Sequence, residues 1–301
     1  MRVFVTGATG FIGSALVPDL IQAGHSVLGL TRSDEGAEAL RKAGAKPHHG
    51  DIYDLDSMRA GAEKADAVIH LAFNHDFSKF VETAETDRRV IEAMGEVLLG
   101  SDRPLIITSG TAVAAGTSEI STELDPPPSS QVNPRAATEE AAAAVTERGG
   151  KVMVVRLSQI HDTHKQGFVS YIIKAAQEKG ASAYLGEGKN RWAACPRFPA
   201  AHLYRLVLEK GQPGKRYNAV DEEGVSMRDM AEAIGERLNL PVRSITAEEA
   251  SAHFGWAAHF AALDLPASSV ITRKQLGWTP SGPTLVEDLR NLELQSKVAA
   301  S

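Results

Sequence analysis

Cysteine is almost absent from this chain, since Cys195 is the only one in 301 residues. One cysteine excludes an internal disulfide framework and fits a reducing compartment, although it is equally the pattern of a small, partly buried apolar residue. No Lys/Arg-rich run occurs, and the net charge of −6 argues against nucleic acid or an anionic membrane surface as a partner. No stretch of about 18 apolar residues exists, and the opening segment lacks the apolar region of a signal peptide. These absences predict a soluble, cytoplasmic protein without a membrane span.

Short apolar runs alternate with helix-like segments through the first half of the chain. Near-continuous apolar strands separated by helices indicate an α/β fold with a doubly wound parallel sheet covered on both faces. After about residue 165 helical patterns dominate. We therefore predict a first domain over residues 1–165 and a smaller, mostly helical substrate lobe over 166–301, from which a strand near 215–220 returns to the sheet. The other expected strands are 2–6, 26–31, a weak one near 46–49, 66–73, 103–109 and 151–157.

A glycine-rich turn, TGATGFIG, follows the first expected strand. Such a pattern is weak evidence alone, but here it stands between a strand and an amphipathic helix, which is the context of a dinucleotide site. Gly7 would allow the tight turn, Gly10 would let the backbone approach a pyrophosphate, and Gly13 would let helix and strand pack closely. Free amides at the helix start would face the anion. The alternative is a turn that merely needs small residues.

The spacing G-x-x-G-x-x-G in VTGATGFIGSALV resembles the fingerprint of the extended and atypical short-chain dehydrogenase/reductases, which include sugar-nucleotide epimerases, 3β-hydroxysteroid dehydrogenases and dihydroflavonol-type reductases. GDIYD (50–54), VIHLAF (68–73), LGW.P (276–280) and L.EDL (285–289) are also similar to segments of this family. The resemblance implies a Rossmann-type sheet, a nicotinamide dinucleotide and a homodimer formed through the long helices beside the sheet. It also implies that Asp51 binds the adenine amine and that Ile52 packs on the adenine ring. The residues predicted to bind the cofactor are Gly7, Thr9, Gly10, Phe11, Ile12, Gly13, Arg32, Ser33, Asp51, Ile52, Leu71, Ala72, Phe73, Thr108 and Ser109.

The end of the second expected strand decides between NADP and NAD. An acid there holds the ribose 2′-hydroxyl of NAD, whereas an arginine takes the 2′-phosphate of NADP. Arg32 and Ser33 suit phosphate, and Asp34 stands one or two places too late for the ribose. We therefore predict that NADP(H) is preferred over NAD(H). In the alternative, Arg32 is solvated and Asp34 reaches the ribose.

The proton-donating motif of the resembled family, Tyr-x-x-x-Lys, is absent, because none of the five tyrosines is followed four residues later by lysine. Arg135 stands where the resemblance places the tyrosine, and Glu139 stands where it places the lysine. Thr111 keeps the position of the Ser or Thr that binds a carbonyl oxygen, with Ser109 two places before it. Arg135 is a poor acid that could stabilise an alkoxide by its charge, or it could pair with Glu139 at i+4.

Other side chains could supply the proton or line the pocket. His161, after the sixth strand, titrates near neutral pH, and Tyr171 lies on the next expected helix. The predicted catalytic residues are Thr111, Arg135, His161 and Tyr171, and the predicted substrate contacts are His75, His161 and Trp192. The histidines could instead be ordinary loop residues, and Trp192 could be core packing. No residues have metal-ligand spacing, so no metal site is predicted.

Three functions are compatible with these residues. The first is an NADPH-dependent oxidoreductase that reduces a small apolar carbonyl or related C=X compound with a non-standard proton donor. The second is an NADP-binding sensor without turnover, which the loss of the Tyr/Lys pair favours. The third, a sugar-nucleotide epimerase or dehydratase, is disfavoured because no clear basic cluster would hold a substrate diphosphate. We predict the first, with a small molecule as its partner.

Overall fold

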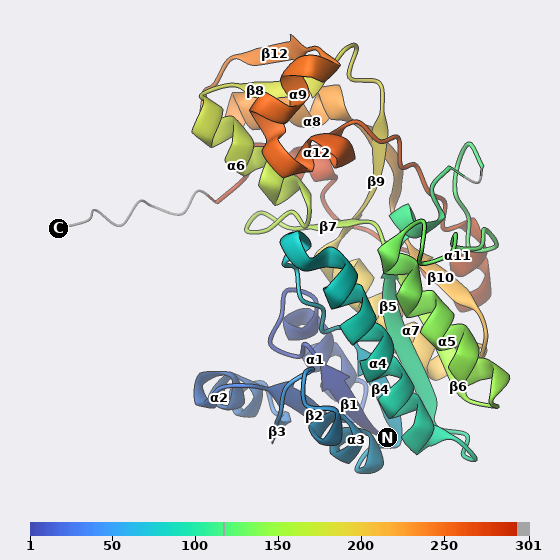
Figure 1. Ribbon diagram of the computed structural model, residues 1–301. Coiled ribbons are helices and arrows are strands. Elements are labelled where there is room, and N and C mark those ends of the chain that lie inside the picture. Colours follow the sequence, from blue (N-terminus) through green and yellow to red (C-terminus); the bar gives the residue numbers. More distant parts are fainter. Residues whose placement is uncertain (117, 294–301) are drawn as a thin grey trace.

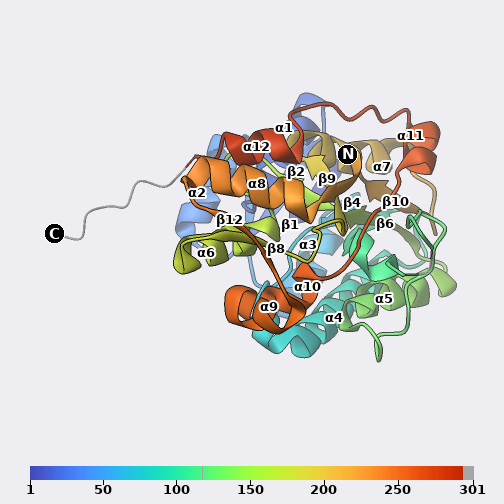
Figure 2. The ribbon, with the colours of Figure 1, turned by 90° about the horizontal axis from the view of Figure 1, so that it is seen from above.

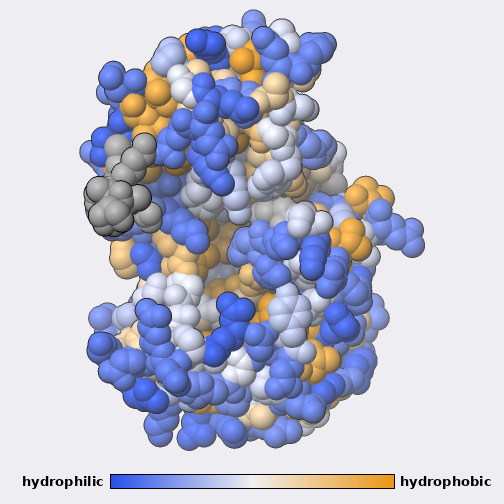
Figure 3. Space-filling view, turned by 60° about the vertical axis from the view of Figure 1, so that its left-hand side comes forward, coloured by the Kyte–Doolittle hydropathy of each residue, from blue (hydrophilic) through white to orange (hydrophobic). Residues whose placement is uncertain are grey.

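The computed structural model describes residues 1–116 and 118–293 of the chain. A larger lobe is built on a seven-stranded sheet, and a smaller lobe holds most of the later helices (Figure 1). The small lobe stands over the carboxyl ends of the strands rather than over either face of the sheet (Figures 1 and 2). The surface is hollowed between the lobes, and apolar residues show inside this cleft (Figure 3). A ligand bound at the end of the sheet would therefore lie between the two lobes.

The sheet of the large lobe is parallel throughout, in the order β10-β6-β5-β4-β1-β2-β3. The strand order reverses at β1 and β4, and this is where sheets of this kind bind ligands, beyond the carboxyl ends of the strands. The strands are β1 (Arg2–Thr6), β2 (Ser26–Thr31), β3 (Lys46–His49), β4 (Ala67–His70), β5 (Pro104–Gly110), β6 (Lys151–Leu157) and β10 (Arg216–Ala219).

Alternating side chains of each strand build two apolar cores, one on each face of the sheet. Val3 and Val5 pack with α1, α2 and α7, whereas Phe4 packs with α3, α4 and α5. Burial of both sets of apolar side chains is the main force that holds the helices on the sheet. The helices of this lobe are α1 (Gly13–Gln22), α2 (Asp34–Lys42), α3 (Leu55–Glu63), α4 (Phe80–Leu98), α5 (Ala137–Glu147), α7 (Arg197–Lys210) and α11 (Val270–Leu276).

The small lobe has its own core around Ile172, Trp192 and Met230, with two small sheets beside it. One sheet is formed by β11 (Glu222–Ser226), β9 (Arg191–Pro196) and β7 (Gln159–His161), and the other by β12 (Val242–Ile245) and β8 (Ser182–Leu185). Its helices are α6 (Val169–Lys179), α8 (Met227–Leu238), α9 (Ala247–Phe254), α10 (Ala258–Ala261) and α12 (Leu285–Arg290). Short 3-10 turns are η1 (Phe77–Lys79), η2 (Thr111–Ala114), η3 (Pro134–Ala136) and η4 (Gly255–Ala257).

The fold class predicted from the sequence is confirmed, namely a doubly wound parallel sheet with a smaller C-terminal lobe. The strand at 216–219 joins the main sheet beside β6, where the sequence places its return. A single boundary at residue 165 does not separate the two cores, because α7, β10 and α11 all pack in the large lobe. The five short strands of the small lobe were not predicted. Among the described helices, none combines the length and apolar character that a bilayer span requires.

Candidate cofactor and active site

The turn between β1 and α1 can approach a ligand closely because three of its residues have no side chain. Gly7 has a φ of +65°, and a Cβ there would come within 2.9 Å of Ala72 N. A Cβ on Gly13 would come within 2.1 Å of Gly7 O, so only glycine lets α1 begin this close to β1. A Cβ on Gly10 would lie 3.0 Å from the same oxygen. This is the geometry that the sequence predicts for a dinucleotide cradle.

The start of α1 offers backbone amides to an anion. The N-cap residue, Ile12, makes no side-chain cap hydrogen bond, and no acidic residue lies in the first turn of this helix. The positive end of the helix dipole is therefore not compensated by a side chain of the helix itself. Phosphate groups bind at such helix ends. The residues present at this turn thus fit the diphosphate of a dinucleotide.

Thr6, the last residue of β1, ties the glycine turn to the segment after β4. Its Oγ1 accepts hydrogen bonds from Leu71 N and Ala72 N, both at 3.1 Å. An oxygen that already accepts two N–H groups gives its own proton to a third partner, so the Thr6 hydroxyl donates to His70 Nδ1 at 2.7 Å. His70 then carries its proton on Nε2, which donates to Asp87 Oδ1 at 2.9 Å. Leu71 and Ala72, both predicted cofactor residues, are thereby fixed beside Gly7.

The residues predicted to select NADP lie together at the ends of β2 and β3. Arg32 Nη1 is 3.8 Å from Asp51 Oδ2, and 75% of the Arg32 side chain is exposed. Ser33 caps α2 by accepting a hydrogen bond from Gly36 N at 3.1 Å, and its own hydroxyl proton can still be donated. Asp34 belongs to the first turn of α2, where the helix dipole stabilises it. An exposed guanidinium beside a hydroxyl donor fits a 2′-phosphate.

A pocket beside α4 brings together residues from the ends of β3 and β4. Ile52, Ala72, Phe73 and Asn74 line this small pocket. Ile52, Ala72 and Phe73 are predicted cofactor contacts, and Ile52 is distant in the sequence from the other two. His75, a predicted substrate contact, is exposed at the same edge, and its ring lies edge-on to that of Phe73 at 5.5 Å.

The guanidinium of Arg135 is held between the ends of β4 and β5. Nη1 donates to Asp87 Oδ2 at 2.8 Å and contacts Thr138 Oγ1, and Nη2 donates to Thr108 O at 2.7 Å. The ring of Phe73 covers the guanidinium, with its centroid 4.1 Å from Cζ. The Arg135 side chain keeps 15% of its surface exposed. The cation therefore contacts two segments that the sequence predicts to line the cofactor.

Asp87, on α4, is the charge partner of Arg135 and is only 4% exposed in its side chain. Burial alone would raise the pKa of Asp87. The charge of Arg135 and the interactions with His70 and Thr138 together outweigh burial and lower the pKa of Asp87 to about 2. Asp87 therefore stays ionised at neutral pH and offsets part of the charge of Arg135.

Glu139, at the lysine position, pairs with two other arginines and not with Arg135. Oε1 accepts from Arg156 Nε at 2.7 Å, and Oε2 accepts from Arg156 Nη2 and Arg216 Nε, each at 2.8 Å. The side chains of Glu139 and Arg156 are each 1% exposed. Burial raises the pKa of Glu139, but hydrogen bonds and charge from the two arginines lower it below its usual value. This pairing replaces the i+4 contact that the sequence left open.

The three hydroxyl residues near the end of β5 differ in their surroundings. Thr108 Oγ1 donates to the carbonyl that ends β4 and is 2.7 Å from Tyr204 Oη, so this side chain faces α7. Ser109 is buried, and its Oγ has no hydrogen-bond partner among the described residues. Thr111 is 6% exposed, and within the described part of the chain its Oγ1 makes only a long contact of 3.4 Å, to Leu157 O. Of these two buried hydroxyl residues, Thr111 keeps slightly more exposed surface than Ser109, at 6% against 3%.

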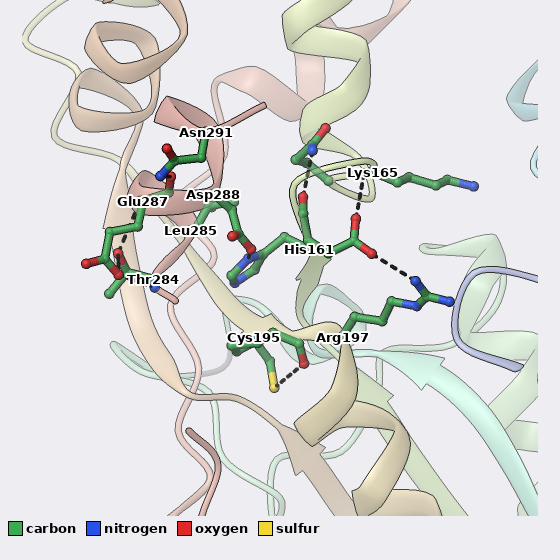
Figure 4. Close-up of polar contacts among 12 residues, drawn as sticks. His161, Lys165, Cys195, Arg197, Thr284, Leu285, Glu287, Asp288 and Asn291 are labelled. Atoms are coloured by element: carbon green, nitrogen blue, oxygen red, sulfur yellow. Dashed lines mark hydrogen bonds and ion pairs between the residues drawn. The ribbon is translucent and has the colours of Figure 1, made fainter. Parts of the chain in front are cut away.

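His161 does not face the cleft, contrary to its predicted catalytic and substrate roles. It has no exposed surface, and its Nδ1 lies 2.7 Å from Asp288 Oδ2 of α12 (Figure 4). Burial outweighs the hydrogen bond to Asp288 and the nearby negative charges, and it lowers the pKa of His161. A side chain without exposed surface cannot touch a substrate. In this structure His161 links β7 to α12.

Trp192 belongs to the core of the small lobe, which was the alternative interpretation of this residue. It is 1% exposed, and its Nε1 donates to Leu263 O at 3.2 Å. Phe168 packs edge-on against it, with ring centroids 5.8 Å apart. Tyr171 packs against Phe168 and against Trp256, the latter at 4.9 Å, and Trp256 is 52% exposed. The aromatic surface of this lobe is therefore offered by Trp256 and not by Trp192.

Sequence reasoning missed the partners of Arg135 and Glu139. Asp87 stands on the apolar face of α4, one helical turn from Ala84 and Val90, and Arg156 stands inside the apolar run KVMVVRL. A charge within an otherwise buried pattern is a signal of a buried ion pair, because an unpaired charge there costs too much free energy. Arg197, at the start of α7, was also missed, and it donates to Phe11 O at 2.6 Å.

Comparison with known proteins agrees with this geometry. Residues 3–219 match the model of the NAD dependent epimerase/dehydratase family. An uncharacterised protein of Schizosaccharomyces pombe is 46% identical (96% of this chain, 98% of that protein), and one of Saccharomyces cerevisiae is 43% identical (96% and 98%). Among solved structures, the fold is similar to that of dTDP-glucose 4,6-dehydratase from Streptomyces venezuelae with NAD and TYD bound. The TM-score is 0.75 at 19% identity, and the match covers 96% of this chain and 95% of that chain. The chain belongs to the NAD dependent epimerase/dehydratase family of the extended short-chain dehydrogenase/reductase superfamily.

Proposed function

We propose that this protein is an NADPH-dependent reductase of a small, largely apolar carbonyl or related C=X compound. The observation that carries the proposal is the place of Arg135, a partly exposed guanidinium in contact with Phe73 and Thr108 beside an intact glycine turn. A reduced nicotinamide supplies a hydride when it is bound. The protein's own residues must then bind the acceptor, stabilise negative charge on its oxygen and admit a proton.

Two residues fit the stabilisation of that oxygen. Thr111, whose hydroxyl makes a long hydrogen bond of 3.4 Å to Leu157 O, can donate to the oxygen of the acceptor. Arg135 can act through its charge but not as an acid, because a guanidinium keeps its proton throughout the neutral range. The pairing of Arg135 with Asp87 weakens this charge without removing it. We propose that the proton comes from water, which the exposed edge of Arg135 can meet.

The choice of NADPH and of an apolar substrate rests on two surfaces. Arg32 is largely exposed next to the Ser33 hydroxyl, which suits the extra phosphate of NADP. Trp256 is 52% exposed and packs with Tyr171, and it offers an apolar, aromatic surface on the small lobe. Substrates with an aromatic or alicyclic body beside the C=O group would suit such a surface.

A second candidate, an NADP-binding sensor without turnover, is favoured by one observation. Both positions of the missing motif are engaged in ion pairs, Arg135 with Asp87 and Glu139 with Arg156 and Arg216. No titratable phenol or amine stands at either position. Such a site could retain the nucleotide while it performs no hydride transfer.

One experiment separates the two functions. Purified protein is titrated with NADPH by calorimetry, and NADPH oxidation is then followed at 340 nm with a panel of aromatic and alicyclic ketones, aldehydes and imines. The reductase binds NADPH and oxidises it with at least one member of the panel, and the Thr111→Ala variant loses most of this rate while its NADPH affinity is kept. Tight binding of NADPH with no turnover across the panel would favour the sensor. No binding of NADPH would refute both functions.

A further inference from the structure

The loop between β7 and α6 carries a lysine that reaches over the glycine turn of the other lobe. Lys165 Nζ lies 5.6 Å from the centroid of the Phe11 ring, and Phe11 directly follows Gly10 of the cradle. The lysine is exposed. In Figure 4 its side chain extends away from His161, in the same general direction as that of Arg197. A residue of the small lobe thus stands above the predicted cofactor site.

The loop that carries Lys165 is held by hydrogen bonds. Asp162 Oδ1 accepts from His164 N and from Lys165 N, each at 2.8 Å, and Asp162 N donates to Lys165 O at 2.9 Å. Gln166 Nε2 donates to Asp162 O at 2.7 Å. Arg197 Nη1 donates to Asp162 Oδ2 at 2.9 Å. The backbone of the lysine is therefore fixed, and only its side chain retains freedom.

Arg197 connects this loop to the glycine turn. Its Nε donates to Phe11 O at 2.6 Å, and its Nη2 donates to Ser14 Oγ at 2.7 Å, while Nη1 holds Asp162. Its Cζ also lies 4.8 Å from the Phe11 ring centroid. One guanidinium thus fixes the distance between the lysine loop and the start of α1. Arg197 is a positioning residue in this arrangement.

The charge of Lys165 also acts across the crevice, on the segment after β4. The pKa of His75 is lowered, first by the atoms packed around its ring and then by the positive charges of Lys165 and Arg135. His75 follows β4, and Phe11 follows β1, the neighbouring strand in the sheet. Lys165 thus lies over Phe11 on the β1 side, and its charge is also felt by His75 on the β4 side.

No described carboxylate forms an ion pair with Lys165, in contrast to Arg197, which pairs with Asp162. The ammonium of Lys165, the guanidinium of Arg197 and the positive end of the α1 dipole all converge around Phe11. Asp162 is the carboxylate bound to Arg197, and it supplies a single negative charge to this group. Like-signed charges held together favour an anion between them.

We propose that Lys165 binds the diphosphate of the dinucleotide from the side opposite the start of α1, so that the phosphates are held by both lobes. This role rests on the proposed function, since it presupposes the cofactor. The family resemblance expects a lysine at position 139, where this chain has Glu139. In our proposal the cofactor instead meets a lysine from another element, namely Lys165 of the loop between β7 and α6.

The test compares ligands with and without a diphosphate. The dissociation constants of NADPH and of adenosine 2′-monophosphate are measured by calorimetry for the unsubstituted protein, Lys165→Met and Lys165→Arg. Lys174→Met is the matched control, because Lys174 is an exposed lysine of the same lobe that pairs with Glu178 at 3.7 Å. We expect Lys165→Met to weaken NADPH about tenfold, the scale of one charge-assisted hydrogen bond, and to leave adenosine 2′-monophosphate unchanged. Lys165→Arg should bind NADPH nearly as the unsubstituted protein does.

Each other outcome overturns the assignment. Unchanged NADPH affinity in Lys165→Met, or equal weakening of both ligands, would show that Lys165 does not bind the diphosphate. A raised KM for the carbonyl substrate with unchanged NADPH affinity would assign the lysine to the substrate instead. If the unsubstituted protein bound no NADPH, the proposed function itself would fail, whereas normal binding with an insensitive Lys165 would refute only this inference.

Discussion

Asp87 Oδ2 and Arg135 Nη1 lie 2.8 Å apart, with 4% and 15% of their side chains exposed, at the position where the family resemblance expects a tyrosine. The pair joins α4 to η3, the turn that precedes α5, and it connects through His70 to Thr6 at the end of β1. The site therefore contains a fixed cation where its resembled relatives have a titratable phenol. This difference governs both the stability and the pH behaviour that we expect of the protein.

Removal of Arg135 alone should destabilise the fold. Arg135→Met leaves the Asp87 carboxylate buried without its cation, which costs about 3–5 kcal/mol of unfolding free energy. The double variant Asp87→Asn/Arg135→Met should lose less than the sum of the two single changes, because neither charge is left unpaired. Urea denaturation of the four proteins measures this coupling. Arg148→Met, an exposed arginine that pairs with Glu96 at 3.5 Å, is the control and should change little.

Acid should remove the contribution that ionised Asp87 makes to the free energy of unfolding. Its pKa is lowered to about 2 in the folded protein, against about 3.9 for an unperturbed aspartate. The unfolded chain binds more protons between these values, so this stabilisation is fully present above about pH 4 and is lost as the pH falls through 2. It amounts to about 2–3 kcal/mol, of which roughly half is gone by pH 3. The measurement is urea denaturation from pH 6 to 3, with Asp87→Asn/Arg135→Met as the baseline. Parallel curves for the two proteins would contradict the assignment.

Replacement of Glu139 by lysine, the residue that the family resemblance expects there, should destabilise the fold. Glu139→Lys would place a cation against Arg156, which is 1% exposed, and against Arg216. Because it also removes the only carboxylate that binds Arg156 among the described residues, we expect a loss of at least about 3–5 kcal/mol. Glu147→Lys, an exposed change on the same helix, should stay within about 0.5 kcal/mol of the unsubstituted protein. Thermal unfolding checks this; a Glu139→Lys variant as stable as its control would refute the buried pairing.

Arg32 should decide the preference for NADPH. Arg32→Ala removes an exposed guanidinium and should weaken NADPH about tenfold or more while NADH binding is nearly unchanged, since only NADPH carries the 2′-phosphate. The two dissociation constants are measured by quenching of protein fluorescence. Arg41→Ala, an exposed arginine on α2 that pairs with Glu38 at 3.4 Å, serves as the control. Equal losses for both cofactors would contradict the role of Arg32.

Local sequence patterns determined the sheet and the cradle. The strands 26–31 and 151–157 lie where apolar runs predict them, because a strand that is buried on both faces of a parallel sheet needs apolar residues along most of its length. The glycines at 7, 10 and 13 predicted the turn, because a Cβ at any of them would crowd the backbone of residue 7 or 72. These features depend on neighbours in the chain, and they could be predicted without the fold. The short strands of the small lobe could not, since three to six residues carry too weak a pattern.

Only the tertiary structure decided which partner each charged residue takes. Arg135 pairs with a carboxylate 48 residues away rather than with Glu139, four residues further along the chain, and His161 contacts Asp288 from 127 residues away. The order of strands and the packing of helices set these distances, and no spacing in the sequence encodes them. Burial then decides which charges must be paired, because an unpaired charge removed from water costs too much free energy. An exposed charge such as that of Lys165 has no such requirement and can bind a ligand.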